Sequence, residues 1–89
     1  MKPFLSVIIP YYNAPEKLER LLSSIEKTKN APPYEIIIVD DGSEPALGQN
    51  GYRTVRLKRN HGPAIARNRG VAAAKGEFVV FLDGDVEVF

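Results

Sequence analysis

Two short runs of mostly β-branched apolar residues constrain the fold of this chain most strongly. Residues 4–9 read FLSVII and residues 34–39 read YEIIIV, so both runs are apolar through their centres and lack the polar alternation of a half-exposed strand. Such runs are typical of strands buried on both faces of a parallel sheet. Because helices must cover both faces of a parallel sheet, the two runs predict an α/β protein.

Two helices are predicted, one before and one after the second run. The first carries leucine or isoleucine at positions 18, 21, 22 and 25, which lie on one face of a helix. Asn13 is predicted to cap its N-terminus, with Pro15 in its first turn. The second helix is predicted at residues 64–75, where many alanines would let it lie close to the sheet, and Gly76 is predicted to end it.

An alternating pattern at residues 53–57, typical of a more exposed strand, and an apolar run at residues 78–82 complete the order β-α-β-β-α-β. Crossovers between parallel strands are right-handed, so the two helices can cover opposite faces only if their crossovers run in opposite directions. We therefore predict an open, doubly wound parallel sheet with strand order 3-2-1-4 and helices on both faces. Ligands of such sheets bind beyond the carboxyl ends of the strands where the order reverses, here between the first and fourth strands.

Polar segments follow three of the four strands at that edge. They are PYYN at residues 10–13, DDGS at 40–43 and DGD at 83–85. The second and fourth strands would lie roughly 10 Å apart, which is comparable with the distance between a nucleobase and its pyrophosphate. Carboxylates at 40 and 41 could accept hydrogen bonds from a base or ribose. Carboxylates at 83 and 85 would repel a diphosphate without a divalent cation, and such oxygen ligands suit Mg²⁺ or Mn²⁺.

Four segments in order resemble glycosyltransferase family 2, a large group of inverting enzymes with the GT-A fold. They are residues 6–13 (SVIIPYYN), 35–43 (EIIIVDDGS), 60–68 (NHGPAIARN) and 76–85 (GEFVVFLDGD), and together they cover essentially the whole chain. The resemblance is specific because the four motifs also have the spacing of the family. It implies a Rossmann-like GT-A sheet whose N-terminal part binds a nucleotide sugar.

The resemblance also implies roles for particular residues. Arg67 would lie near the nucleotide, and Asp83 would face the ribose or the metal. Asp85 would be the principal ligand of a Mn²⁺ or Mg²⁺ ion. Contacts to the base and ribose would come from the first two motifs, namely Pro10, Tyr11, Tyr12, Asn13, Asp40 and Asp41.

The activity implied by the resemblance is transfer of a sugar from a nucleoside-diphosphate sugar to an acceptor hydroxyl with inversion, assisted by a general base. Uridine is the commonest donor base in the family, and the implied acceptors are saccharides or lipid-linked molecules. In this family the acceptor site and the base lie in the later half of the domain. We therefore expect residues 1–89 to be the donor-binding part of a longer domain, truncated and inactive alone, with the catalytic base beyond Phe89.

Three other functions fit parts of the pattern. A sugar-phosphate nucleotidyltransferase would have a basic, glycine-rich loop after the first strand, where residues 10–13 read PYYN. A phospho-acceptor signalling domain would need an aspartate after the third strand, where residues 58–60 read KRN. A non-catalytic module that binds nucleotide weakly, or not at all, stays open as an alternative.

Charge and hydropathy narrow the expected partners. A net charge of +1 offers no general attraction to nucleic acid, which we do not expect as a partner. The first apolar run is too short for a signal peptide or a membrane span, so we expect a cytoplasmic location, with the full-length protein at the cytoplasmic face of a membrane as a further expectation.

Two surface features are also expected. Residues 51–70 contain six cations and no acid, which predicts a mostly solvated face with Arg67 as the exception. Apolar surface left beside the fourth strand predicts homo-oligomers.

Overall fold

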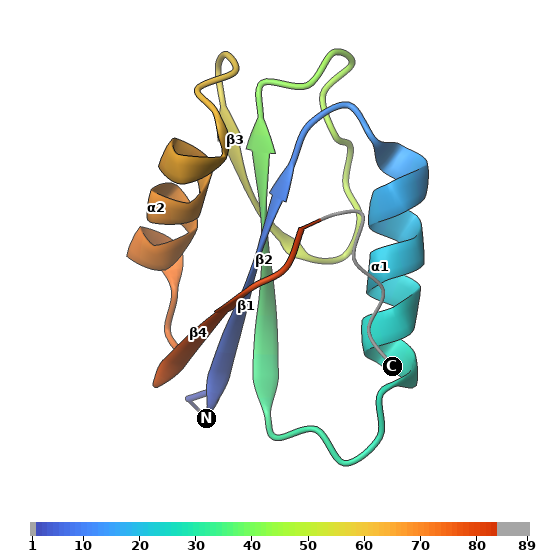
Figure 1. Cartoon of the computed structure of the whole chain (residues 1–89), viewed down its shortest axis with the longest axis vertical. Helices are drawn as coiled ribbons and strands as arrows, with labels where there is room; N and C mark the ends of the chain where they lie inside the picture. The colour runs from blue at the N-terminus through green and yellow to red at the C-terminus, as the bar shows by residue number, and fades with distance from the viewer. Residues whose placement is uncertain (1, 84–89) are drawn as a thin grey trace.

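A parallel sheet with one helix on each face forms the part of the chain that the computed structural model describes, residues 2–83 (Figure 1). The strands lie in the order β3-β2-β1-β4, and all three pairings are parallel. This confirms the predicted doubly wound α/β fold and its strand order. The elements are β1 (Leu5–Tyr11), α1 (Pro15–Lys27), β2 (Tyr34–Asp41), β3 (Arg53–Leu57), α2 (Pro63–Ala73) and β4 (Phe78–Phe81).

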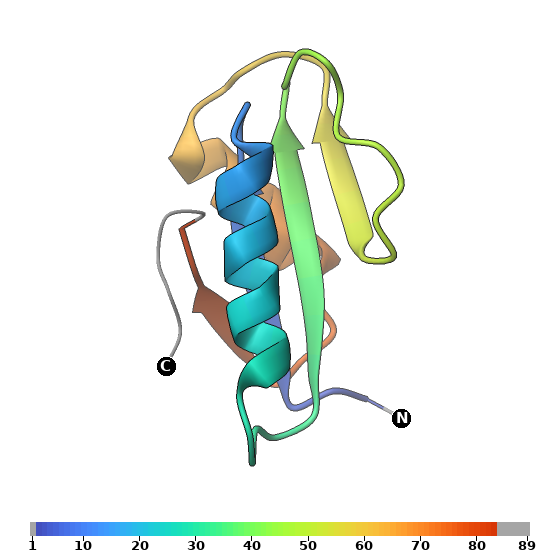
Figure 2. The ribbon, with the colours of Figure 1, turned by 90° about the vertical axis from the view of Figure 1, so that its right-hand side faces the viewer.

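Helix α1 covers one face of the sheet with the apolar stripe that its sequence predicts (Figure 2). Leu18, Leu21 and Ile25 are buried on that stripe. Burying a side chain of this size stabilises a fold by roughly 1.5–3 kcal/mol. The stripe packs in one cluster with four inward-facing strand residues, Val7, Ile9, Ile36 and Ile38, and this packing attaches α1 to the sheet.

The predicted capping of α1 by Asn13 is wrong, although Pro15 does occupy the first turn. The N-cap residue is Ala14, and no side chain caps the helix. Asn13 instead adopts a left-handed backbone conformation with φ of 47°, which asparagine tolerates better than most residues. Its Oδ1 atom accepts a hydrogen bond from the N–H of Glu44 at 2.8 Å. A capping pattern is local, so it does not reveal a partner this distant in the sequence.

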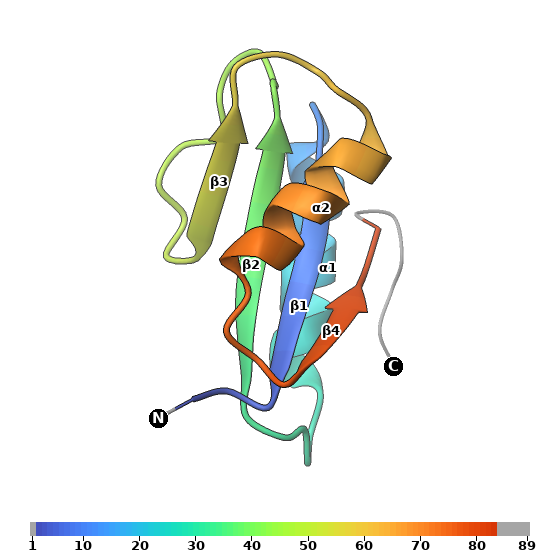
Figure 3. The same ribbon diagram turned by 90° about the vertical axis from the view of Figure 1, so that its left-hand side faces the viewer.

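Helix α2 lies close to the opposite face because its inner surface is made of Ala66 and Gly70 (Figure 3). A Cβ atom on Gly70 would lie only 2.3 Å from Cγ2 of Ile8. This confirms the prediction of a small-residue helix packed against the sheet. The second buried cluster lies under this helix and comprises Ile8, Ile37, Val39, Leu57 and Ala66.

The predicted helix end at Gly76 is wrong, because α2 stops at Ala73 with Ala74 as its C-cap. Gly76 lies further along the chain and packs against β1. Its N–H donates a hydrogen bond to Oγ of Ser6 at 2.8 Å, and an added Cβ would lie 2.7 Å from the backbone nitrogen of Ser6. Glycine is needed here because two backbones approach closely.

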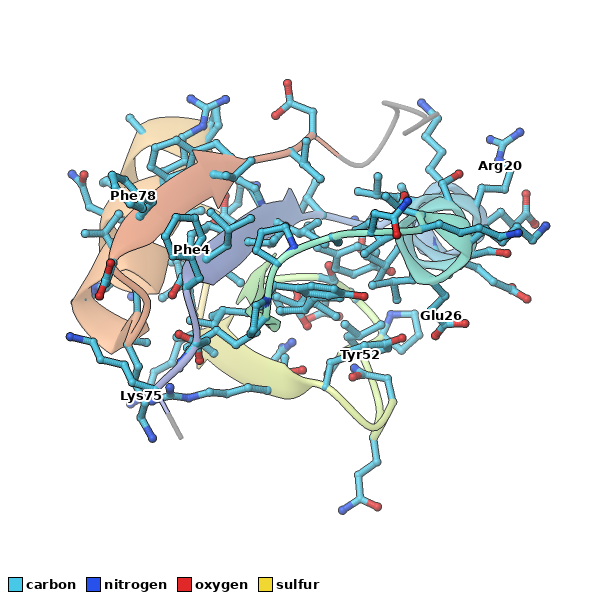
Figure 4. All side chains as sticks on the ribbon, turned by 90° about the horizontal axis from the view of Figure 1, so that it is seen from below. Phe4, Arg20, Glu26, Tyr52, Lys75 and Phe78 are labelled. Carbon is cyan, nitrogen blue, oxygen red and sulfur yellow. The ribbon has the colours of Figure 1, made fainter. Side chains whose placement is uncertain are left out.

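Strand β4 is the shortest and most exposed of the described strands. Its Phe78, Val79 and Phe81 are 56%, 36% and 46% exposed. Phe78 lies beside Phe4, with ring centroids 5.0 Å apart (Figure 4). The apolar surface expected beside this strand is therefore present, whereas the formation of homo-oligomers stays a prediction.

No helix within residues 2–83 is both long and apolar enough to span a bilayer. The cytoplasmic location stays a prediction.

Candidate functional site

The carboxyl ends of β1, β2 and β3 meet at one edge of the sheet (Figure 1). The register pairs Tyr11 with Asp40 and Asp41 with Leu57, so the last residues of these strands are neighbours. Strand β2 is two residues longer than predicted, and the aspartate pair therefore belongs to the strand. Because successive strand side chains point to opposite faces, the two carboxylates serve different surroundings.

Asp40 is completely buried and organises the loop that follows β2. Its Oδ1 accepts the N–H of Ser43 at 3.0 Å, and its Oδ2 accepts the N–H of Leu47 at 2.9 Å. Nη1 of Arg56, its neighbour on β3, lies 2.8 Å from Oδ2. Burial alone would raise the pKa of Asp40, but the hydrogen bonds from Leu47 and Ser43 and the charge of Arg56 outweigh it and lower the pKa.

Asp41 is 4% exposed and holds the loop between β3 and α2. Its Oδ1 accepts the N–H of His61 at 2.8 Å, and its Oδ2 accepts the N–H of Gly62 at 2.9 Å. His61 therefore meets this acid through its backbone, and its imidazole is not part of the contact. Gly62 has φ of 94°, a conformation that favours glycine and lets the chain turn directly into α2.

The segment after β1 is hydrogen-bonded to the loop between β2 and β3 through Ser43. The N–H of Asn13 donates to Oγ of Ser43 at 2.9 Å, while Oδ1 of Asn13 accepts the N–H of Glu44. Ser43 is itself fully buried and held by Asp40. A continuous chain of hydrogen bonds therefore runs from Asp40 through Ser43 to Asn13 and joins the ends of β1 and β2.

Tyr11 and Tyr12, which were both predicted to contact the base, differ in their exposure to solvent. Tyr11 is 6% exposed, and burial, together with the nearby charge of Asp40, raises its pKa despite a backbone hydrogen bond from Ala14. Tyr12 is 49% exposed, and Pro10, which precedes both tyrosines, is half-buried. Of the two tyrosines, only Tyr12 therefore has a side chain that a ligand at this edge could reach.

Arg67 of α2 and Asp83, two residues beyond β4, form the other end of the predicted site. Nη2 of Arg67 lies 3.3 Å from Oδ1 of Asp83, and its guanidinium carbon lies 6.0 Å from the centroid of the Phe81 ring. The Asp83 side chain is 57% exposed, so its carboxylate is open to a ligand. The structure thus brings Arg67, which was predicted to lie near the nucleotide, next to one acid of the predicted metal pair.

Asp85 lies outside the described residues, so its predicted role as principal metal ligand stays a prediction. Among residues 2–83, no three His, Cys, Asp or Glu side chains gather in a way that could hold a metal ion. The described part of the chain contributes one carboxylate, Asp83, to the predicted metal site.

The basic stretch is mostly solvated with Arg67 as the half-buried exception, as predicted, although two of its exposed arginines also have acidic partners. Arg53 pairs with Glu35 at 3.8 Å, and Arg56 pairs with Asp40 at 2.8 Å. Arg67 is therefore not the only arginine of the stretch with an acidic partner. Sequence reasoning named Ser43 only as part of the DDGS segment and missed Arg56, because the signal that finds Arg56 is the pairing of β3 with β2, which places it beside Asp40.

A doubly wound α/β domain with acids at its carboxyl edge is the class of protein that this fold and site define. The family model described as glycosyl transferase family 2 matches residues 6–89, and the chain belongs to that family. The poly(ribitol-phosphate) β-N-acetylglucosaminyltransferase TarP of Staphylococcus aureus is 39% identical over 91% of this chain and 28% of TarP.

Solved structures show the same architecture. TarS from S. aureus in complex with UDP-GlcNAc superposes with a TM-score of 0.77 and 33% identity, covering 92% of this chain and 26% of TarS. The mannosyltransferase PcManGT from Pyrobaculum calidifontis, in complex with GDP-Man and Mn²⁺, has a TM-score of 0.77 and 26% identity, covering 96% of this chain and 28% of that enzyme. The chain spans 14% to 36% of the length of the curated relatives it matches.

Proposed function

We propose that this chain supplies the donor and metal site of a glycosyltransferase that moves a sugar from a nucleoside-diphosphate sugar to an acceptor hydroxyl with inversion. The observation that carries the proposal is the placement of Asp41 at the end of β2 and of Asp83, paired with Arg67 of α2, just after β4, the two strands that flank β1. That is where the strand order reverses, and ligands of doubly wound sheets bind there.

The base and ribose would lie at the end formed by β1 and β2. Tyr12 is exposed there, and the Asp41 carboxylate oxygens each accept one N–H and keep a second lone pair. A ring N–H or a ribose hydroxyl could donate to that free position. Asp40 is fully enclosed, so it would act by holding the loop after β2. The complex of TarS with UDP-GlcNAc supports uridine as the donor base.

The diphosphate would lie at the end formed by Arg67 and Asp83. The guanidinium of Arg67 presents several N–H donors to phosphate oxygens, and Asp83 holds it in place from one side. Asp83 and Asp85 would hold a divalent cation, because Mg²⁺ and Mn²⁺ need only one or two carboxylates when substrate phosphates complete their coordination. The Mn²⁺ in the PcManGT complex supports this assignment. When bound, the ion would neutralise charge on the departing nucleoside diphosphate.

This proposal assigns donor binding to residues 1–89 and assigns no catalytic base to them. The acceptor contacts and the base would come from the part of the family 2 domain that the relatives have beyond the matched region. The remaining alternative, a non-catalytic module that binds nucleotide weakly or not at all, is separated from the proposal by a binding experiment.

Titration of the chain with UDP by calorimetry, with and without Mn²⁺, tests the proposal. Binding should require the metal, and Asp83→Asn should weaken it by at least about tenfold because a metal ligand becomes a neutral amide. Glu19→Gln removes an exposed acid on α1 and should leave the affinity unchanged. A wild-type chain that is folded by circular dichroism and binds neither UDP nor GDP with either metal would exclude the proposal.

A further inference from the structure

The loop between β2 and β3 is held at three of its backbone atoms by one ion pair. Asp40 accepts the N–H groups of Ser43 and Leu47, at 3.0 and 2.9 Å. Nη1 of Arg56 lies 2.8 Å from the Asp40 carboxylate, and Nη2 of the same guanidinium donates to the carbonyl oxygen of Ser43 at 3.3 Å. Arg56 thus contacts both the acid that organises the loop and the loop itself.

Arg56 is the only cation among the described partners of this buried carboxylate. Asp40 has no exposed surface, and a buried carboxylate is strongly disfavoured unless a countercharge and hydrogen bonds replace its water. The backbone N–H groups of Ser43 and Leu47 supply hydrogen bonds but no charge. Removing Arg56 would therefore favour a state in which Asp40 turns toward solvent, and both of its loop contacts would be lost together.

The consequence reaches the segment after β1. Ser43 is buried, and its Oγ accepts the N–H of Asn13 at 2.9 Å, while the adjoining N–H of Glu44 donates to Oδ1 of Asn13 at 2.8 Å. Asn13 follows Tyr12, the exposed aromatic residue of the proposed base end, and its left-handed conformation is maintained by these two contacts.

We propose that Arg56 is a positioning residue for nucleotide binding: through Asp40 and Ser43 it holds the segment that carries Tyr12 and Asn13. This inference rests on the proposed function, because it gives Arg56 an effect on the affinity for a nucleoside diphosphate. Arg56 need not touch the nucleotide itself. Lysine is an imperfect replacement, because Arg56 reaches the carboxylate and the carbonyl with two different nitrogens of a rigid planar group, whereas an ammonium offers a single nitrogen.

Arg53 provides a matched control on the same strand. It also pairs with an acid on β2, Glu35, at 3.8 Å, and it donates to the carbonyl oxygen of Ala73 at 2.8 Å. It pairs in register with Ile37, whereas Arg56 pairs with Asp40 three residues nearer the carboxyl edge. Arg53→Met therefore removes a comparable arginine from β3 without touching the loop that Arg56 holds.

Amide hydrogen exchange of the ligand-free chain, followed by NMR, tests the positioning step. In Arg56→Met the amides of Asn13, Ser43 and Leu47 should exchange at least about tenfold faster than in wild type, measured relative to the core amide of Ile8. The amide of Gly62, held by Asp41, should be unaffected. In Arg53→Met all four amides should stay within about twofold of wild type.

Calorimetric titration with UDP and Mn²⁺ tests the functional step. Arg56→Met should raise the Kd for UDP by about tenfold, Arg56→Lys by less, and Arg53→Met by no more than about twofold. Faster exchange in Arg56→Met with an unchanged Kd would overturn the inference. A raised Kd with unchanged exchange would also overturn it, because Arg56 would then act by contact with the nucleotide and not by positioning. If Arg56→Met does not fold, Arg56→Lys carries the same comparison.

A wild-type chain that binds no UDP would refute the proposed function and this inference with it. A wild-type chain that binds UDP, with an Arg56→Lys variant that matches it in both exchange and affinity, would refute the inference alone. The two failures are therefore distinguishable in the same titrations.

Discussion

Replacement of Gly70 by alanine should destabilise the chain, although helix propensity alone predicts the opposite. Gly70 lies inside α2 and faces the sheet. Alanine in place of glycine within a helix stabilises by roughly 0.8–1 kcal/mol. The added Cβ, however, would lie 2.3 Å from Cγ2 of Ile8, 3.2 Å from its Cδ1 and 3.3 Å from Cγ2 of Val39. The two effects oppose each other, so their magnitudes decide the sign.

The packing effect is the larger one. A separation of 2.3 Å is roughly 1.2 Å shorter than an ordinary contact between carbon atoms, so a shift of a few tenths of an ångström does not relieve it. Ile8 is fully buried and β-branched, which leaves its side chain few alternative rotamers. Overpacking of a core costs roughly 1–3 kcal/mol, and this contact belongs near the upper end. We therefore expect a net loss of about 2 kcal/mol, or about 10 °C in Tm.

Urea unfolding followed by far-ultraviolet circular dichroism measures this loss. Ala72→Gly is the calibrating variant, because Ala72 is exposed on the same helix and should lose up to about 1 kcal/mol from propensity alone. A Gly70→Ala chain that is as stable as wild type, or more stable, would refute the close packing of α2. Because α2 also carries Arg67, an outward shift of this helix should weaken UDP binding as well.

Three other contacts make measurable predictions. The pKa of Asp40 is lowered in the folded state, so its charge contributes stability that is present above the ordinary pKa of 3.8 and is lost as the pH falls through the lower folded pKa. Asp40→Asn should therefore flatten the decline of the urea midpoint below about pH 4, and curves of midpoint against pH that run parallel for the variant and wild type would contradict this. Gly42→Ala should lower the free energy of unfolding by at least about 3 kcal/mol, because φ is 76° and the added Cβ would lie 2.4 Å from the backbone carbon of Arg59. Gly51→Ala, where φ is 82° but the Cβ would meet no atom, should lower it by only about 1 kcal/mol in the same assay. A hydrogen bond to Glu26 raises the pKa of Tyr52 to about 12 (Figure 4), so Glu26→Gln should lower the ionisation midpoint in ultraviolet titration, and equal midpoints would exclude that contact.

The strand order was predictable because it follows from two general properties of parallel sheets, the burial of both faces and the right-handed crossover. Strands β1 and β2 are buried throughout their centres, and right-handed crossovers leave few ways to cover both faces. The helix ends were not predictable in the same way. Asn13 and Gly76 are both ordinary helix-end residues, but their partners are Glu44 and Ser6, which only the folded chain brings near them.

The location of the candidate site was predictable, whereas its internal bonding was not. Asp40, Asp41 and Asp83 follow apolar runs, so a parallel sheet places them toward one edge. The sequence does not reveal that the acids of β2 bind backbone N–H groups, since those contacts depend on loop conformation. The role of Arg56 depends in addition on the register of β3 against β2, which a five-residue strand with mixed polarity leaves undetermined.

The adjacency of Asp40 and Asp41 has a physical reason in the alternation of a strand. Asp40 points to the α1 side and holds the loop at Ser43 and Leu47, and Asp41 points to the α2 side and holds the loop at Gly62. A single acid could not reach both loops, because each strand residue presents its side chain to only one face. Two consecutive acids at the end of β2 therefore fix the loops on both sides of the edge where β1 ends. Because the N–H groups that hold both loops belong to the chain itself, these loop contacts need no nucleotide to complete them, and loops preformed in this way would lower the cost of binding.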